Sequence, residues 1–209
     1  MKNIKYSILL VIVSIFMSNS LFAQRVLIGP RIAGNFNIYN QKGLTGTYNG
    51  LGITAGGQVD VLFSKNIGMF VNVNVFDMKN FGRSSTANNV TTDESYSLSY
   101  ASVEPLFQAN FNGFYFGGGA AIGFKLNSSG EVTQTATGQA PVVTANDIET
   151  KSVRFDIVVN TGYTFTLSPD MAMGTDFNVH IPVTDTYNTP GVSNSILSLK
   201  LGVALKFRI

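Results

Sequence analysis

The last segment of the chain alternates strictly between two kinds of side chain. From Leu197 to Ile209 every odd position is apolar, and every even position is polar or small. Successive side chains of a β-strand point to opposite faces, so this segment is predicted to be a strand with one apolar and one polar face. A similar two-row pattern recurs in residues 26–38, 51–63, 67–75, 96–107, 114–125, 153–165 and 171–181.

The fourth of these segments breaks the rule. Tyr96, Leu98 and Tyr100 share one parity, whereas Val103 and Phe107 share the other. A β-bulge adds one residue to a strand and reverses the parity beyond it. We therefore expect a bulge near Ala101 that keeps both sets on the apolar face.

The connections alternate in length. Residues 64–66, 110–113 and 168–170 form tight turns, whereas residues 40–50, 78–95, 127–152 and 184–194 form long polar loops. Short periplasmic turns and longer outer loops are typical of membrane barrels with both termini on the periplasmic side. The fold predicted is an all-β, eight-stranded antiparallel up-and-down transmembrane β-barrel in the cell outer membrane.

The apolar row is predicted to face outward. A soluble lipocalin-like barrel would alternate in the same way with its apolar row inside, but a barrel of eight strands has little interior volume, and the apolar row would overfill it. Glycines of the opposite row leave room when they point inward. These are Gly29, Gly52, Gly56, Gly68, Gly117, Gly119, Gly123, Gly162, Gly174 and Gly202. An aromatic girdle near the tight turns is expected from Phe63, Phe107, Phe111, Phe114, Phe165 and Phe207.

The start of the chain reads as a cleaved signal peptide. Lys2 and Lys5 precede an apolar run over residues 8–17, and Ala23 marks the expected cleavage site. The domains predicted are a signal peptide at 1–23 and an outer-membrane barrel at 24–209.

The composition of the chain excludes several classes of partner and site. The chain has 14 Lys and Arg against 12 Asp and Glu, so removal of Lys2 and Lys5 leaves 12 against 12, and no nucleic-acid partner is expected. The chain has no cysteine, which excludes disulfides, thiolate metal sites and a lipoprotein anchor. Charged residues make up 12% of the chain. A soluble surface carries roughly 25–35%, so we expect lipid to cover much of the exterior.

Three short tracts carry a family resemblance. Residues 28–37 read Ile-Gly-Pro-Arg-Ile-Ala-Gly-Asn-Phe-Asn, residues 103–106 read Val-Glu-Pro-Leu, and residues 114–123 are rich in glycine. These tracts resemble PorT-type, OmpA-like small outer-membrane β-barrel proteins. The resemblance implies the fold and an outer-membrane address, but it transfers no role in secretion or assembly. The adjacency of Glu104 and Pro105 and the final Ile209 depart from the family pattern.

The polar row predicts a network of charges in the lumen. Because charges removed from water need partners, paired side chains are expected to close a narrow barrel. The pattern places three of these residues at a similar depth in the barrel, so their side chains are expected to meet. They are Arg31, Glu104 and Asp176. The predicted members are Arg31, Lys125, Arg154, Lys200, Lys206 and Arg208 with Asp60, Glu104, Asp156 and Asp176.

The sequence offers no strong catalytic motif. His180 is the only histidine, and no nucleophile motif accompanies it, so we expect a lumen residue with satisfied hydrogen bonds. A barrel protease would need paired acids at the outer rim, and Asp77 and Asp185 could approach that rim, but nothing in the sequence fixes their separation. We predict no catalytic, cofactor or metal site, and no enzyme.

Several functions stay open. The favoured hypothesis is a non-enzymatic barrel with a structural or surface-binding role, in which the loop at 127–152 contacts an extracellular ligand or an envelope protein. The alternatives are a narrow pore or an accessory subunit of a secretion machine, an outer-membrane enzyme acting on lipid or peptide, and a soluble secreted barrel. The partners expected in every membrane case are outer-membrane lipid and the barrel-insertion machinery.

Overall fold

The computed structural model describes residues 25–43, 46–146, 149–188 and 192–209. The expected signal peptide at 1–23 lies outside these residues. Within them, no helix is long and apolar enough to cross a membrane. The strands are β1 (Arg25–Gln41), β2 (Tyr48–Leu62), β3 (Ile67–Ala87), β4 (Val90–Phe111), β5 (Phe114–Ala136), β6 (Val142–Ala145), β7 (Val153–Ser168), β8 (Met171–Pro182) and β9 (Asn194–Arg208).

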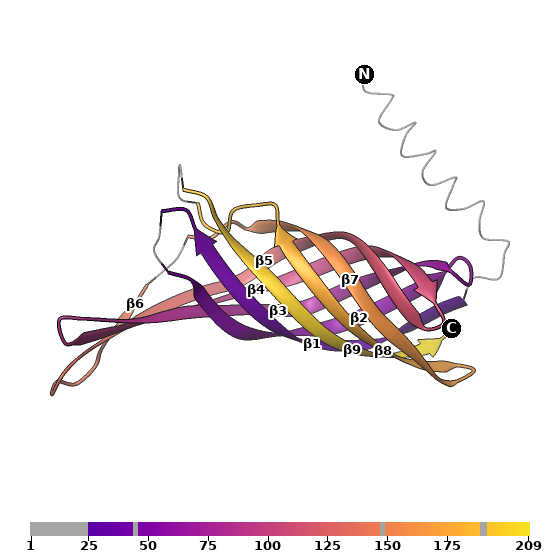
Figure 1. Ribbon diagram of the computed structural model, residues 1–209, viewed down its shortest axis with the longest axis horizontal. Helices are drawn as coiled ribbons and strands as arrows, with labels where there is room; N and C mark the ends of the chain where they lie inside the picture. Colours follow the sequence, from indigo (N-terminus) through magenta and orange to yellow (C-terminus); the bar gives the residue numbers. More distant parts are fainter. Residues whose placement is uncertain (1–24, 44–45, 147–148, 189–191) are drawn as a thin grey trace, which may run out of the picture.

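Eight of these strands form a closed ring. The order is β4-β3-β2-β1-β9-β8-β7-β5, and an additional pairing between β4 and β5 closes it. Each pair of neighbours is antiparallel, and β6 pairs only with β5 outside the ring. The predicted up-and-down barrel of eight strands is confirmed (Figure 1).

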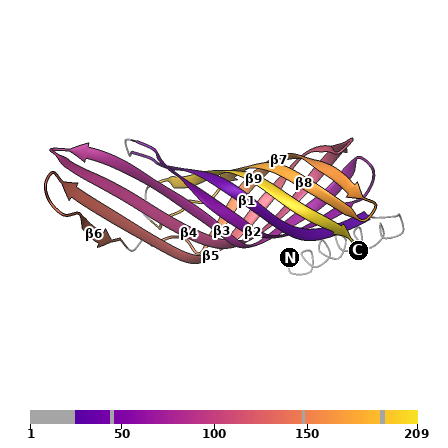
Figure 2. The same ribbon diagram turned by 90° about the horizontal axis from the view of Figure 1, so that it is seen from below.

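Three strands continue past the ring. The outer parts of β3, β4 and β5 form a sheet with β6 that projects from the end opposite the C-terminus (Figures 1 and 2). We call this the protruding sheet, and it comprises residues 83–87, 90–97, 127–136 and 142–145. The other end of the barrel, where Leu27 pairs with Arg208, carries the tight turns and is called the turn end.

The protruding sheet corrects two predictions. Residues 78–95 are not a loop, because β3 and β4 run to a tight turn in which Asn88 and Asn89 adopt positive φ of 51° and 62°. Most of residues 127–152 is also strand, in β5 and β6. These segments were predicted as loops because most of their residues are polar on both faces of the sheet, so they show no two-row pattern. Ser, Thr and Asn, which are frequent in them, are also usual in loops.

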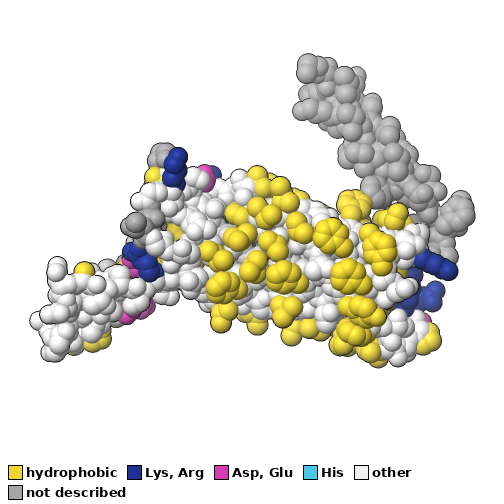
Figure 3. Space-filling model, viewed as in Figure 1, with side chains coloured by type: hydrophobic (Ala, Val, Ile, Leu, Met, Phe, Trp, Pro, Cys, Tyr) yellow, Lys and Arg dark blue, Asp and Glu magenta, His cyan; other side chains and the backbone are white. Residues whose placement is uncertain are grey.

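The apolar row faces outward, as predicted. Leu51 and Leu201 are 72% and 68% exposed, whereas Arg31 and Asp176 are 1% and 2% exposed. Figure 3 shows hydrophobic side chains over the middle of the visible face, with charged side chains near its two ends. The polar row is therefore enclosed, and the lipocalin-like orientation is wrong.

The fourth strand differs from the prediction. Tyr96, Leu98 and Tyr100 belong to the inward row of β4, and Leu98 and Tyr100 are buried. The strand keeps its alternation, and the irregularities lie on its neighbours. Asn74 pairs with Ser102 and Asp77 with Tyr100, so β3 places two residues opposite Ala101. The bulge therefore lies across from Ala101 and not within β4.

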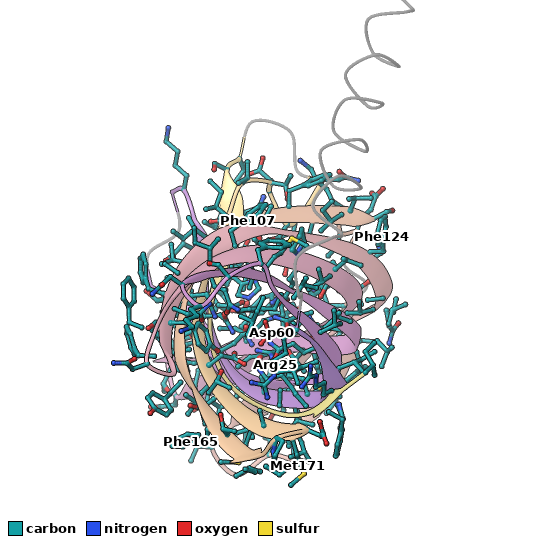
Figure 4. All side chains as sticks on the ribbon, turned by 90° about the vertical axis from the view of Figure 1, so that its right-hand side faces the viewer. Arg25, Asp60, Phe107, Phe124, Phe165 and Met171 are labelled. Carbon is teal, nitrogen blue, oxygen red and sulfur yellow. The ribbon has the colours of Figure 1, made fainter. Side chains whose placement is uncertain are left out.

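Aromatic side chains surround the turn end. Phe107, Phe111, Phe114, Phe165 and Phe207 are all exposed there, as the predicted girdle requires. Figure 4, which views the barrel from this end, shows Phe165 outside the ring. Phe63, also expected in the girdle, is only half-buried.

Inward glycines allow close strand contacts. A Cβ atom at Gly117 would lie 2.0 Å from the carbonyl oxygen of Phe107 on the neighbouring strand. Gly34 faces outward on β1, and a Cβ atom there would meet nothing within 4 Å. A side chain would therefore overlap the neighbouring backbone at Gly117 and would have free space at Gly34.

The substitution Gly117→Ala is expected to destabilise the barrel by about 1–3 kcal/mol, because the backbone must shift to relieve the overlap. Gly34→Ala is the matched control, and it is expected to change stability by less than about 1 kcal/mol. Urea unfolding in detergent, followed by tyrosine fluorescence, measures both. Equal losses in the two variants would contradict this packing.

Candidate functional site

Among the residues that the structure describes, ten charged side chains lie in the interior of the barrel, and each has a relative exposure of 6% or less. Five are basic and five are acidic, so their formal charges cancel. Buried charges are tolerated only when they are paired and hydrogen-bonded. We call this group the lumen network, and it consists of Arg31, Asp60, Asp77, Lys79, Glu104, Arg154, Asp156, Asp176, Lys200 and Lys206.

Arg31 and Asp176 form a two-point ion pair across β9. The Arg31 Nε donates to Asp176 Oδ2 at 3.0 Å, and Nη2 donates to Oδ1 at 2.5 Å. Such paired contacts fix both the distance and the plane of the guanidinium group. Gly202 of β9 makes room for them, because a Cβ atom there would lie 2.7 Å from Arg31 Nη2 and 2.7 Å from Asp176 Oδ1.

Lys200 joins two carboxylates of β3 and β4. Its Nζ lies 3.0 Å from Asp77 Oδ2 and 3.0 Å from Glu104 Oε1. Lys79 Nζ lies 3.2 Å from the same oxygen of Asp77 and donates to Ser198 Oγ at 3.1 Å. One carboxylate therefore serves two ammonium groups in the middle of the barrel.

Neutral side chains also donate hydrogen bonds to Asp77 and Glu104. Thr54 Oγ1 and Asn35 Nδ2 donate to Asp77 Oδ1 at 2.8 Å and 3.0 Å. Asn72 Nδ2 donates to Glu104 Oε2 at 3.0 Å, and Asn74 Nδ2 donates to Oε1 at 2.8 Å. A buried ion pair is stable only when such extra hydrogen bonds offset the loss of water.

Two further pairs extend the network toward the ends of the barrel. Lys206 Nζ lies 2.8 Å from Asp60 Oδ2 near the turn end, where Gln108 Nε2 donates to Oδ1 at 2.9 Å. Arg154 Nε lies 2.9 Å from Asp156 toward the opposite end, and its Nη2 also donates to the carbonyl of Ile196. Charges are thus paired along most of the lumen.

His180 points into the lumen, as expected, but its contacts are long. Its Nδ1 lies 3.5 Å from Asp156 Oδ2, and its Nε2 lies 3.8 Å from Glu104 Oε1. Neither nitrogen has a hydrogen-bond partner of ordinary geometry among the described residues. His180 is thus a buried lumen residue enclosed between two carboxylates, and Asp156 is its nearest polar partner.

Apolar clusters fill the lumen where the charges are fewest. Toward the protruding sheet, Tyr39 stacks on Phe81 with a 5.0 Å centroid separation. Nearer the tight turns, Phe70 meets the ring of Tyr115, the second residue of β5, at 5.6 Å. The first cluster contains Tyr39, Tyr48, Phe81, Leu98, Tyr100 and Ile196, and the second contains Phe70, Leu106, Tyr115, Ala121 and Val158.

The structure places two predicted members elsewhere. Lys125 is only partly buried, near the loops, and its Nζ donates to the carbonyl of Thr150 at 3.0 Å. Arg208 is exposed at the turn end. Arg31 and Asp176 meet directly, whereas Glu104 is paired with Lys200. The other predicted members lie inside the barrel.

Sequence reasoning missed Asp77 and Lys79. Asp77 was expected at the outer rim beside Asp185, but it is buried inside the barrel. The cause is the bulge in β3, because Val75 has no partner on β2 and every residue after it changes face. The exposure of Val75 and Phe76 at consecutive positions marks that bulge. Two neighbouring apolar residues on one strand were the available signal.

Glu94 is the centre of a second polar cluster. This cluster lies closer to the protruding sheet than the exposed apolar side chains of β3 and β4. It accepts hydrogen bonds from Tyr48 Oη at 2.7 Å, Tyr96 Oη at 3.1 Å and Arg83 Nη2 at 3.0 Å. Partial burial raises the pKa of Glu94, but the hydrogen bonds and the Arg83 charge outweigh it, and the net pKa lies below 4.5. Arg83 also lies 4.8 Å above the Tyr48 ring. This cluster fastens the base of the protruding sheet.

The variant Asp176→Asn is expected to destabilise the barrel by about 3–5 kcal/mol, because Arg31 loses its charge partner in the interior. Asp170→Asn removes an exposed carboxylate at the turn end and serves as the matched control. The measurement is the temperature at which the folded, detergent-resistant band disappears from a gel. Similar temperatures for both variants would show that the buried pair contributes little.

The protruding sheet is expected to loosen in acid. Because the folded-state pKa of Glu94 lies below 4.5, its contribution is complete above that value and is lost as the pH falls through the folded-state pKa. Hydrogen exchange of residues 83–97 at pH 6 and at about pH 3 measures this. Glu94→Gln should lose about 1 kcal/mol of local stability at pH 6 and show a smaller pH dependence. An unchanged pH dependence in that variant would refute the assignment.

Comparison with known proteins gives only general similarities. No protein-family model and no curated protein match the chain. Among solved structures, the attachment invasion locus protein Ail of Yersinia pestis is 11% identical, with a TM-score of 0.40 over 87% of this chain and 98% of that chain. Neisserial surface protein A is 10% identical, with a TM-score of 0.42 over 88% and 97%. The outer membrane protein OprG from Pseudomonas aeruginosa is 10% identical, with a TM-score of 0.46 over 90% and 96%. At these values the similarity is one of general form. The PorT-type resemblance stays a prediction.

Proposed function

We propose that this protein is a non-enzymatic integral outer-membrane barrel whose lumen is closed and whose protruding sheet presents a binding surface outside the cell. The observation that carries the proposal is the division of the side chains between two environments. Apolar side chains cover the outside of the ring, while ten compensating charges and two apolar clusters occupy its inside.

The outward face supports placement in a bilayer. Ile32, Leu51 and Leu201 are 63%, 72% and 68% exposed, and in water they would form part of a large apolar surface. A closed barrel also satisfies the backbone hydrogen bonds that lipid cannot. The turn end, with its aromatic girdle and short turns, then faces the periplasm, and both ends of the mature chain lie there. Outer-membrane lipid is the immediate partner, and the barrel-insertion machinery acts during assembly.

The interior supports a closed lumen. An ion that passes through would have to separate pairs such as Arg31 with Asp176 or Lys200 with Glu104, and each group would then need a new partner. The stacked rings of Tyr39 and Phe81 close the end near the protruding sheet. This arrangement favours a structural or binding role over a narrow pore.

The protruding sheet is the surface proposed to contact an extracellular ligand or an envelope protein. It projects from a rigid ring, and binding residues are commonly found on such projections. Its exposed side chains include Ser84, Ser85 and Thr86 of β3 and Val142 and Val143 of β6. Asp93 and Glu131 are exposed on the same sheet, so hydroxyl groups, small apolar side chains and two carboxylates are available to a polar partner.

Two measurements test the membrane and lumen parts of this proposal. The protein is expected in the outer-membrane fraction, and its gel mobility should change on boiling. In planar bilayers it should show no large, stable conductance. A protein found in the aqueous fraction without detergent would overturn the placement, and a steady open channel would overturn the closed lumen.

A shortened variant tests the binding surface. Replacing residues 84–93 by a two-residue turn removes the tip of β3 and β4 and leaves the ring intact. Cells that lack the protein are complemented with either form, and binding of the cells to envelope and host-surface extracts is compared. Full activity of a correctly inserted shortened protein would show that the tip is not the contact surface.

A further inference from the structure

A polar pocket of about 170 Å³ opens at the turn end. It lies on the inward side of the strands, below the pair formed by Lys206 and Asp60. Figure 4 shows Arg25 and Asp60 within the ring of strands when the barrel is viewed from this end. Its lining includes Arg25, Asp60, Lys65, Gln108, Asn110 and Leu27.

The charges around the pocket favour an anion. Asp60 is the acidic residue of the wall, and both of its carboxylate oxygens are engaged, one by Lys206 at 2.8 Å and one by Gln108 at 2.9 Å. Arg25 and Lys65 also line the pocket, and no ion pair of either is found among the described residues. Because Lys206 neutralises Asp60, the positive charges of Arg25 and Lys65 remain uncompensated.

Two buried donors in the wall have no acceptor. Arg25 Nε and Asn110 Nδ2 are both buried, and neither has a hydrogen-bond partner in the part of the chain that the structure describes. Arg25 Nη2 is held by the carbonyl of Pro169 at 3.4 Å. Buried donors in folded proteins are nearly always paired, so two of them in one pocket require an explanation. An oxyanion supplies several acceptor atoms at once.

Apolar side chains next to the charged ones strengthen such an interaction. Leu62 is the cross-strand partner of Arg25, and Leu27 and Ala172, each 1% exposed, also line the pocket. Apolar surroundings lower the local dielectric constant, so a charge in the pocket interacts more strongly with Arg25 than it would in open water. The pocket is also too small for a folded partner, and it opens to the aqueous phase instead of the outer apolar face.

We propose that this pocket binds a small oxyanion of double negative charge, with hydrogen phosphate or a phosphate monoester group as the ligand. Arg25 and Lys65 supply the charge, and Arg25 Nε with Asn110 Nδ2 supply directed hydrogen bonds. The ligand enters from the periplasmic side if the barrel has the proposed orientation. The binding chemistry itself does not depend on that orientation, because it can be measured in detergent.

The test is a titration of the full mature protein in neutral detergent micelles with inorganic phosphate at constant ionic strength. Isothermal calorimetry gives the affinity, and the side-chain amide resonance of Asn110 reports the location. Arg25→Gln and Lys65→Gln should each weaken binding about ten-fold or more, and Asn110→Asp should abolish it by placing a negative charge in the wall. Lys151→Gln at the far end of the barrel is the control, and it should bind like the wild type.

Two further ligands test the charge of the bound anion and the molecule from which it comes. Acetate, which has one charge, should bind at least about ten-fold more weakly than phosphate, because one of the two cations is left without a partner. Glycerol phosphate distinguishes the source of the group. Binding as tight as that of phosphate would assign the pocket to a monoester on a larger molecule, and weaker binding would assign it to the free ion.

Several outcomes would overturn the proposal. These are the absence of saturable binding, an Asn110 amide that does not respond, equal weakening by Lys151→Gln, or acetate binding as tightly as phosphate. Heat-modifiable gel mobility shows that each variant is folded, so a loss of binding is not confused with a loss of the barrel. A folded Arg25→Gln variant with unchanged affinity would likewise reject the site.

Discussion

Pairing of charges in an enclosed space is the constraint on which this protein depends. The ring of strands is narrow, and among the described residues ten charged side chains are buried inside it. Each carboxylate therefore meets a cation or several donors, as Asp77 does with Lys200, Lys79 and Thr54. The small residues of the same row, such as Gly202, are necessary because they leave room for these contacts. Outward apolar side chains and inward paired charges are two consequences of one closed sheet.

The sequence predicts the barrel well because alternation is a local property. Period-two patterns identify the eight strands, and the volume of a small barrel decides which row points inward. The same reasoning locates most of the lumen network, since Arg31, Glu104 and Lys200 sit on clearly alternating segments. Nothing local, however, shows which acid will meet which base. Arg31 and Asp176 are 145 residues apart in the chain, and their contact depends on register around the whole ring.

The errors have two physical sources. Two adjacent apolar residues are only a weak signature of a bulge, so the one in β3 was not predicted. It moves Asp77 from the expected outer rim, and Lys79 from an expected loop, into the lumen. Strands with polar side chains on both faces also escape detection, because they lack the contrast that reveals a strand. The protruding sheet was therefore predicted as two loops. Tyr96, Leu98 and Tyr100 were misplaced for a related reason, since an apolar cluster inside the barrel looks in sequence like another outward row.

Several of the lumen ion pairs connect strands that are not neighbours, and this has a consequence for how the molecule forms. Arg31 of β1 reaches Asp176 of β8, and Lys200 of β9 reaches β3 and β4. In an incompletely assembled sheet these groups are far apart and remain hydrated, so the attraction between them contributes only after β1 and β9 have met. Sealing that last seam and dehydrating the interior are thus a single event. Such coupling makes half-closed species unfavourable and gives the finished barrel a high barrier to reopening.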